Sequence, residues 1–150
     1  MLAIPEEYAA FASTYLTGGY HKDAAILDDV QIGRTSVGGR FRMTSRFEPP
    51  EGGVDLSIPN VVSWILQLAV IYGCTQHGLS GYRNLSLREV SLKALRPVED
   101  LSSITVRIRV RFRRPVPQGV YYVGDIDVAD GGYAGRIGFT FPTDSPDSKC

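Results

Sequence analysis

The sequence has few cysteines, no excess of either charge and no long uninterrupted apolar segment. Cys74 and Cys150 are the only cysteines among 150 residues, so neither a disulfide framework nor a cysteine-ligated zinc site is indicated. Sixteen basic side chains balance sixteen acidic ones, which gives no electrostatic reason to expect a nucleic-acid partner. We therefore expect no metal, no other cofactor and no nucleic acid.

A membrane-spanning helix needs ~20 consecutive apolar residues, and the longest candidate segment, 58–72, falls short of that length. It is interrupted by a proline and three polar side chains: Pro59, Asn60, Ser63 and Gln67. The first seven residues contain glutamates where an export signal has basic residues. The sequence therefore predicts a cytoplasmic protein with no membrane partner.

The length and composition fit a single globular domain, since 43% of residues are hydrophobic and 21% are charged. We expect the domain to occupy residues 1–141, with a helical segment within 1–19. That segment contains a short helix over 5–16, ended by Gly18-Gly19. The polar tail over 142–150 is expected to be disordered.

The segment from Pro59 to about Tyr72 predicts one strongly apolar helix. Pro59 near its start and Gly73 just past its end match the residue preferences of helix termini. Only Ser63 and Gln67 form a narrow polar line along it. A helix that is apolar on nearly every side needs cover on every side, so we expect it at the centre of the domain, wrapped by a sheet.

The remaining sequence predicts antiparallel strands. Six segments have strand-like patterns: 25–32, 40–47, 85–98, 106–113, 116–128 and 133–141. Gly38-Gly39 is expected to form the turn between the first two strands, and 129–132 the hairpin turn between the last two. A sheet curled around one long central helix describes the α+β hotdog fold.

Three short motifs occur in order along this pattern. Tyr20-His21-Lys22 precedes an apolar run and Asp28, Ile58-Pro59-Asn60-Val61-Val62 opens the helix, and Leu92-Lys93-Ala94-Leu95-Arg96-Pro97-Val98 follows it. Over roughly 20–141 the chain resembles the hotdog-fold 3-hydroxyacyl-acyl carrier protein dehydratases, whose Pro-His-Arg, Met-Pro-Gly-Val-Leu and Phe-Lys-Arg-Pro-Val motifs these are similar to. The resemblance implies an acyl-thioester substrate on acyl carrier protein or coenzyme A, and a homodimer. A weaker likeness links 111–116 to long-chain acyl thioesterases of the same fold.

Two positions depart from the dehydratase pattern. Glu51 stands where that family keeps its catalytic histidine, and Ile65 stands where its helix has an acidic residue. Dehydration and thioester hydrolysis therefore both stay open. A non-catalytic hotdog protein that binds an acyl or polyketide-like ligand, or a partner protein, is the alternative.

The start of the predicted helix and the preceding loop supply the candidate site. Backbone N–H groups around Asn60 and Val61 are placed to polarise a thioester carbonyl, unless Ser57 or solvent caps them. Asp55 or Glu51 would act as general base, although both also fit surface charges and Asp55 fits a helix cap. We predict catalytic roles for Asp55, Glu51, Asn60 and Gln67, and substrate-binding roles for Ser57, Val61, Ser63 and Trp64.

Gln67 also fits a buried amide that bonds a strand carbonyl, which is the commoner outcome. His21 and His77 are predicted to be structural. No histidine is placed to activate Ser63 as a nucleophile.

The strand over 106–113 alternates apolar and cationic residues. Its arginines are Arg107, Arg109, Arg111 and Arg113, followed by Arg114. One interpretation is a docking surface for an acidic carrier protein or the phosphates of coenzyme A. The other, which we favour, is a solvated outer sheet face with Asp125 and Asp127 available for pairing.

Overall fold

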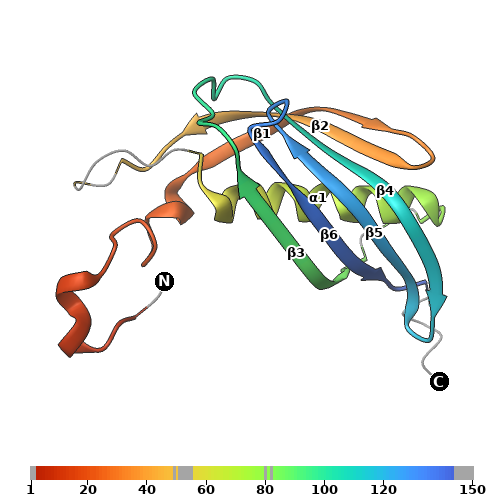
Figure 1. Ribbon diagram of the computed structural model, residues 1–150, viewed down its shortest axis with the longest axis horizontal. Helices are drawn as coiled ribbons and strands as arrows, with labels where there is room; N and C mark the ends of the chain where they lie inside the picture. Colours follow the sequence, from red (N-terminus) through yellow and green to blue (C-terminus); the bar gives the residue numbers. More distant parts are fainter. Residues whose placement is uncertain (1–2, 49, 51–55, 80, 82, 144–150) are drawn as a thin grey trace.

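The computed structural model describes residues 3–48, 50, 56–79, 81 and 83–143. Its elements are η1 (Glu6–Phe11), η2 (Gly19–Lys22), β1 (Ala24–Ile32), β2 (Ser36–Ser45), α1 (Ile58–Gln76), β3 (Ser86–Ala94), β4 (Ile104–Val116), β5 (Gly119–Val128) and β6 (Tyr133–Phe141). The six antiparallel strands form one sheet in the order β1-β2-β4-β5-β6-β3, and α1 lies across its inner side (Figure 1). The predicted curled sheet with one long helix is confirmed.

The C-terminal hairpin follows the sequence pattern most closely. β6 begins and ends where we predicted, and β5 alternates strictly between buried and half-buried residues. The turn between them contains three residues with positive φ: Ala129 at 55°, Asp130 at 51° and Gly131 at 91°. The predicted hairpin turn at 129–132 is therefore confirmed.

The turn between β1 and β2 lies at residues 33–35, so our prediction of a turn at Gly38-Gly39 is wrong. Both glycines lie inside β2. A Cβ atom on Gly39 would come within 2.9 Å of the side chains of Leu27 and Leu68. Glycine is needed there because strand and helix approach closely.

The helix α1 continues past Tyr72 to Gln76, so Gly73 lies inside it rather than beyond its end. A Cβ atom on Gly73 would lie 2.3 Å from the Phe141 ring, which explains the glycine by close packing. The helix ends before Gly78, whose φ of +62° is the left-handed conformation that terminates helices.

One side of α1 packs against the sheet. Its buried residues are Val61, Trp64, Ile65, Leu68, Ala69, Tyr72 and Gly73. Although α1 is long and apolar enough to cross a membrane by length and composition, this packing identifies it as a core helix. The other side carries exposed Ser63 and Gln67, and Ile58 is 46% exposed. The helix is thus central to the sheet as expected, but the cover expected on every side is limited to one side among the described residues.

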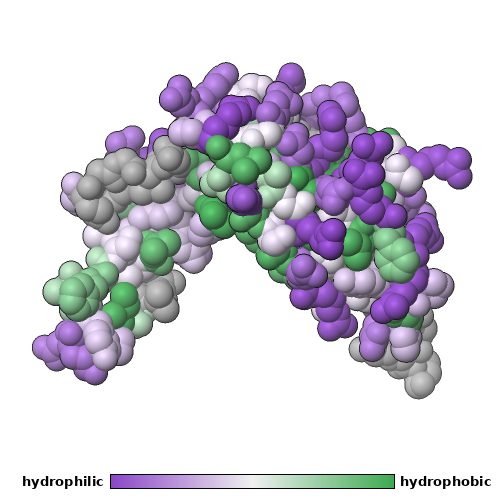
Figure 2. Space-filling view, in the orientation of Figure 1, coloured by the Kyte–Doolittle hydropathy of each residue, from purple (hydrophilic) through white to green (hydrophobic). Residues whose placement is uncertain are grey.

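In the N-terminal segment, the short helix predicted over 5–16 is found only over Glu6–Phe11, as a 3-10 helix. The segment contains the 3-10 helices η1 and η2; η1 stands away from the sheet (Figure 1) and projects from the body of the molecule in the space-filling view (Figure 2), while η2 leads directly into β1. Within η1, Tyr8 is 56% exposed and Phe11 is 83% exposed, so η1 lacks the tertiary packing that stabilises a short α-helix, whereas Tyr15 further along is buried. Of the tail predicted to be disordered, residues 144–150 lie outside the described residues.

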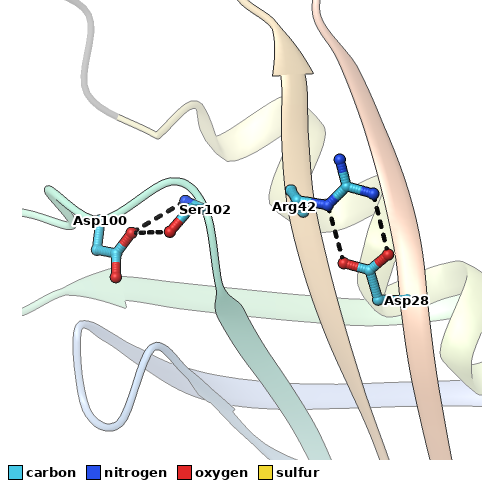
Figure 3. A network of polar contacts seen from close by, with 4 residues as sticks. All are labelled: Asp28, Arg42, Asp100 and Ser102. Atoms are coloured by element: carbon cyan, nitrogen blue, oxygen red, sulfur yellow. Dashed lines mark hydrogen bonds and ion pairs between the residues drawn. The ribbon is translucent and has the colours of Figure 1, made fainter.

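Two carboxylates outside the core order local structure (Figure 3). The Arg42 guanidinium donates to both oxygens of Asp28, at 3.1 and 3.2 Å, and thereby lowers the pKa of that carboxyl. The Asp100 carboxylate accepts from the amide and the hydroxyl of Ser102, at 3.0 and 2.5 Å, in the turn before β4. Asp28, from the first dehydratase-like motif, thus links β1 to β2 through its ion pair with Arg42.

The arginine-rich strand β4 contains a β-bulge between Val110 and Phe112. Before the bulge, Arg107 and Arg109 point to the solvated face, and within it the Arg111 side chain bonds Asp125 at 2.5 Å. After it, the Arg113 guanidinium lies 5.6 Å from the centre of the Tyr122 ring, which is buried on the inner side. The favoured interpretation of a solvated, acid-paired face is confirmed for Arg111. The continuous alternation predicted up to Arg113 is wrong.

We expect Gly73→Ala to lower the free energy of unfolding by roughly 1–3 kcal/mol, because the fully buried Phe141 ring must move. Urea unfolding measures this change. Gly81→Ala is the matched control, since a Cβ atom there meets nothing within 4 Å. A more stable Gly73→Ala variant, as helix propensity alone would give, would contradict the packing argument.

Candidate functional site

The N-terminus of α1 begins at a buried serine cap. Ser57 Oγ accepts from the Asn60 amide at 3.3 Å, and the Ser57 carbonyl accepts from the Val61 amide at 3.1 Å. The two amides that we considered for oxyanion binding, those of Asn60 and Val61, therefore both donate to Ser57, which matches the alternative of a Ser57 cap. Pro59 has no N–H group, and the amides of Asn60 and Val61 are bonded to Ser57. In the first turn, the N–H group of Ile58 is therefore the one that has no partner within the helix.

The Asp23 carboxylate gathers three donors beside this helix start. Its Oδ2 accepts from Asn60 Nδ2 at 2.6 Å and from the Tyr15 hydroxyl at 2.7 Å. Its Oδ1 accepts from the Phe47 amide at 2.6 Å. The carboxylate thus joins the N-terminal segment, the end of β2 and the helix in one polar cluster.

Tyr15 closes this cluster from the N-terminal side. Its side chain is 4% exposed and its ring stacks on Phe47, with 6.4 Å between ring centres. Burial raises the pKa of Tyr15 to about 12; the neighbouring Asp23 charge also raises it, while a hydrogen bond with Ser57 opposes the shift. The Tyr15 hydroxyl is therefore protonated at neutral pH and serves Asp23 as a donor.

The Asn60 carboxamide has a defined orientation as a result. Its Nδ2 atom faces Asp23, because a carboxylate accepts hydrogen bonds and would repel the amide oxygen. The Oδ1 atom is consequently the end of the carboxamide that is directed away from Asp23. It is an acceptor at the start of the helix.

The structure separates the other predicted site residues into two groups. Val61 and Trp64 lie in the core, where the Trp64 ring stacks on Phe41 with 4.8 Å between ring centres. Ser63 and Gln67 lie on the exposed side of α1; the Ser63 hydroxyl donates to the Asn60 carbonyl at 2.8 Å. Of the predicted residues, the structure thus brings Ser57, Ser63 and Asn60 together at the helix start.

Both predicted loop carboxylates, Glu51 and Asp55, lie outside the described residues. Their catalytic roles stay predictions, as do those of Asn60 and Gln67. Gln67 is exposed, which does not match the buried amide we considered as its alternative role.

Our sequence analysis missed Tyr15 and Asp23. Asp23 directly follows the Tyr20-His21-Lys22 motif, and that position was the one available signal. Nothing in the spacing of residues 15, 23 and 60 indicates that they meet, because their contact depends on how the N-terminal segment crosses the helix start.

A second polar contact lies at the other end of α1. His77 Nε2 lies 2.8 Å from the Tyr122 hydroxyl, and the His77 ring stacks on Phe141 with 5.4 Å between ring centres. Burial, assisted by the Arg113 guanidinium, lowers the pKa of His77 below its ordinary value of 6.5. These contacts support the predicted structural role of His77, as a neutral residue in an aromatic cluster.

No protein-family model and no curated protein sequence matches the chain. Its three-dimensional structure does resemble solved structures. A mutant thioesterase from Staphylococcus aureus aligns with a TM-score of 0.57 and 12% identity, over 79% of this chain and 93% of that one. The chain has the hotdog fold.

Two further hotdog structures support this result. A hypothetical thioesterase with coenzyme A from Streptococcus pneumoniae aligns with a TM-score of 0.58 and 7% identity, over 79% of this chain and 88% of that one. A dehydratase heterocomplex from Xenorhabdus doucetiae aligns with a TM-score of 0.55 and 12% identity, over 77% and 82%. The predicted α+β hotdog fold is confirmed, and at these identities the likeness concerns the fold.

We expect the stability of the protein to fall as the pH drops below about 6.5, with His77 as one cause. The folded protein holds His77 at a lowered pKa, so the unfolded chain takes up the proton first. Urea unfolding between pH 7.5 and pH 5 measures the effect. His77→Gln removes this contribution and should flatten the profile; an unchanged slope in the variant would contradict it.

Proposed function

We propose that this hotdog protein is an enzyme that acts on an acyl-thioester linked to coenzyme A or acyl carrier protein. The observation that carries the proposal is the organised start of α1, where Asp23 and Tyr15 hold the Asn60 carboxamide in one orientation. The hotdog fold, which the chain shares with thioesterases and with a dehydratase heterocomplex, supports the same substrate class. As part of the same proposal, we place the enzyme in the cytoplasm.

Thioester hydrolysis is the reaction that this arrangement fits best. Asn60 Oδ1 accepts a hydrogen bond from a water molecule and directs it at the thioester carbonyl carbon. The positive end of the helix dipole, with the Ile58 N–H, stabilises the negative charge on the carbonyl oxygen. A C–O bond forms, the C–S bond breaks, and the proton from water is passed through a carboxylate, Asp55 or Glu51, to the leaving thiolate.

Dehydration of a 3-hydroxyacyl-thioester is the second candidate. The order of the three dehydratase-like motifs favours it, and so does the fold shared with the dehydratase heterocomplex. Glu51 and Ile65 at the positions of the family's histidine and acid favour hydrolysis instead.

The two reactions are distinguished by their products. We expect saturated acyl-coenzyme A and 3-hydroxyacyl-coenzyme A to release free thiol, measured with a thiol reagent, without forming an enoyl product detectable by ultraviolet absorbance or mass spectrometry. Asn60→Ala should reduce kcat by roughly 10²–10³-fold, the usual effect of losing a preorganised polar group. Asp23→Asn should reduce kcat at least tenfold while the protein stays folded.

Asp29→Asn is the matched control, because Asp29 is an exposed carboxylate on β1 away from the helix start. Enoyl formation without thiol release would replace hydrolysis by dehydration. If Asn60→Ala and Asp23→Asn both left turnover unchanged, another site would be responsible. Saturable acyl binding with no turnover of either substrate would favour the non-catalytic alternative.

We further propose that two chains associate as a homodimer through the β3 edge. β3 is at one end of the sheet order, so one of its edges has backbone groups that no described strand pairs. Leu87 on β3 is 39% exposed, and Ile58 at the start of α1 is 46% exposed. A second chain that continues the sheet would cover apolar surface that this sheet leaves open.

Small-angle scattering and light scattering should therefore give a dimer mass. Leu87→Lys should weaken the dimer, because it places a charge at the proposed contact. Ile26→Lys is the matched control, since Ile26 is 45% exposed on the opposite edge strand β1. A monomer at micromolar concentration, or dissociation by Ile26→Lys alone, would exclude pairing through β3.

A further inference from the structure

A shallow hollow of about 310 Å³ lies on the outer side of the sheet, beside the β4–β5 hairpin. Its lining residues are Arg88, Arg114, Val116, Gln118, Tyr121 and Thr140. The lining side chains thus include two guanidinium groups, two hydroxyls and one carboxamide, and none of them is acidic. The hollow therefore has a positive charge and several hydrogen-bond donors.

Neighbouring contacts position both arginines. Arg88 Nε donates to Thr140 Oγ1 at 3.3 Å, and Thr140 is buried, with 5% of its surface exposed. The Arg114 guanidinium lies 5.7 Å from the centre of the Tyr121 ring. Gly138 leaves room for that ring, since a Cβ atom there would come within 2.7 Å of the Tyr121 hydroxyl.

Two other arginine-bearing sites on the outer side include acidic partners. Arg111 is paired with Asp125, on the same two strands as the hollow. A larger hollow of about 340 Å³ is lined by two arginines, Arg40 and Arg107, but also by three aspartates: Asp29, Asp127 and Asp130. Of these two hollows, the one at Arg88 and Arg114 is therefore the one that has arginines and no acidic lining residue.

We propose that this hollow binds the phosphate group of a small molecule. The planar guanidinium fork of arginine matches the oxygens of a phosphate, and such bonds are stronger than those between neutral groups. Thr140 and Gln118 provide further polar contacts around the two arginines. The ligand is either free phosphate or diphosphate, or the phosphorylated end of a coenzyme A molecule.

The phosphate site is separate from the start of α1. The hairpin lies at the end of the sheet where α1 finishes, because His77 just beyond the helix contacts Tyr122 and Phe141. Tyr121 and Tyr122 are neighbours on β5 that point to opposite sides of the sheet. A ligand on the Tyr121 side therefore does not contact Asn60, and the proposal goes beyond the thioester reaction.

Calorimetric titration of the full chain tests the proposal without any measurement of turnover. We expect saturable binding of sodium diphosphate that weakens as salt is added. Arg88→Gln and Arg114→Gln should each weaken it at least tenfold. Arg109→Gln removes an arginine of the same face that does not line the hollow, so this control should bind nearly as well as the original protein.

Parallel titrations with coenzyme A, dephospho-coenzyme A and pantetheine identify the source of the phosphate. If coenzyme A binding falls in Arg114→Gln while pantetheine binding does not, the hollow holds the phosphorylated end of coenzyme A. If diphosphate alone responds to Arg114→Gln, the hollow is a site for free phosphate compounds. No saturable diphosphate or coenzyme A binding, or an equal loss in Arg109→Gln, would overturn the proposal, whatever the outcome of the thioester assays.

Discussion

Burial of one side of α1 against the curved sheet is the interaction on which the rest of the structure depends. Each fully buried Leu, Ile or Val side chain contributes ~1.5–3 kcal/mol, and seven helix residues are buried. Two glycines make the contact close enough: Gly39 lets β2 approach Leu68, and Gly73 lets the helix approach Phe141. The position and direction of α1 are therefore determined by steric fit as much as by hydrophobicity.

The geometry of the candidate site at the start of α1 depends on this packing. Because α1 is held along its length, its first turn has a defined place against which the N-terminal segment and the end of β2 can be ordered. Asp23 satisfies donors from all three parts, and Tyr15 is buried in the process. The orientation of the Asn60 carboxamide thus depends on the tertiary structure rather than on the local helix sequence.

The features that were predictable from the sequence are those that follow from local periodicity. β6, the 129–132 turn and the existence of α1 depend on alternation, turn residues and an apolar run. The errors at Gly38-Gly39 and Gly73 share one cause: glycine serves both for turns and for close packing, and the sequence does not distinguish these uses. The Tyr15–Asp23–Asn60 cluster was not predictable because its members meet only through the path of the folded chain.

The β-bulge in β4 has a consequence for how charge is distributed through the sheet. Side chains of a strand alternate between two sides, so one additional residue reverses the side taken by every residue that follows. Phe112 is therefore 49% exposed, while Arg113 reaches Tyr122 on the inner side near His77. The same reversal returns Arg114 to the outer side, over Tyr121. A single unpaired residue in the ladder thus gives two adjacent, exposed arginines of one strand different neighbours, Tyr122 on the inner side for Arg113 and Tyr121 on the outer side for Arg114.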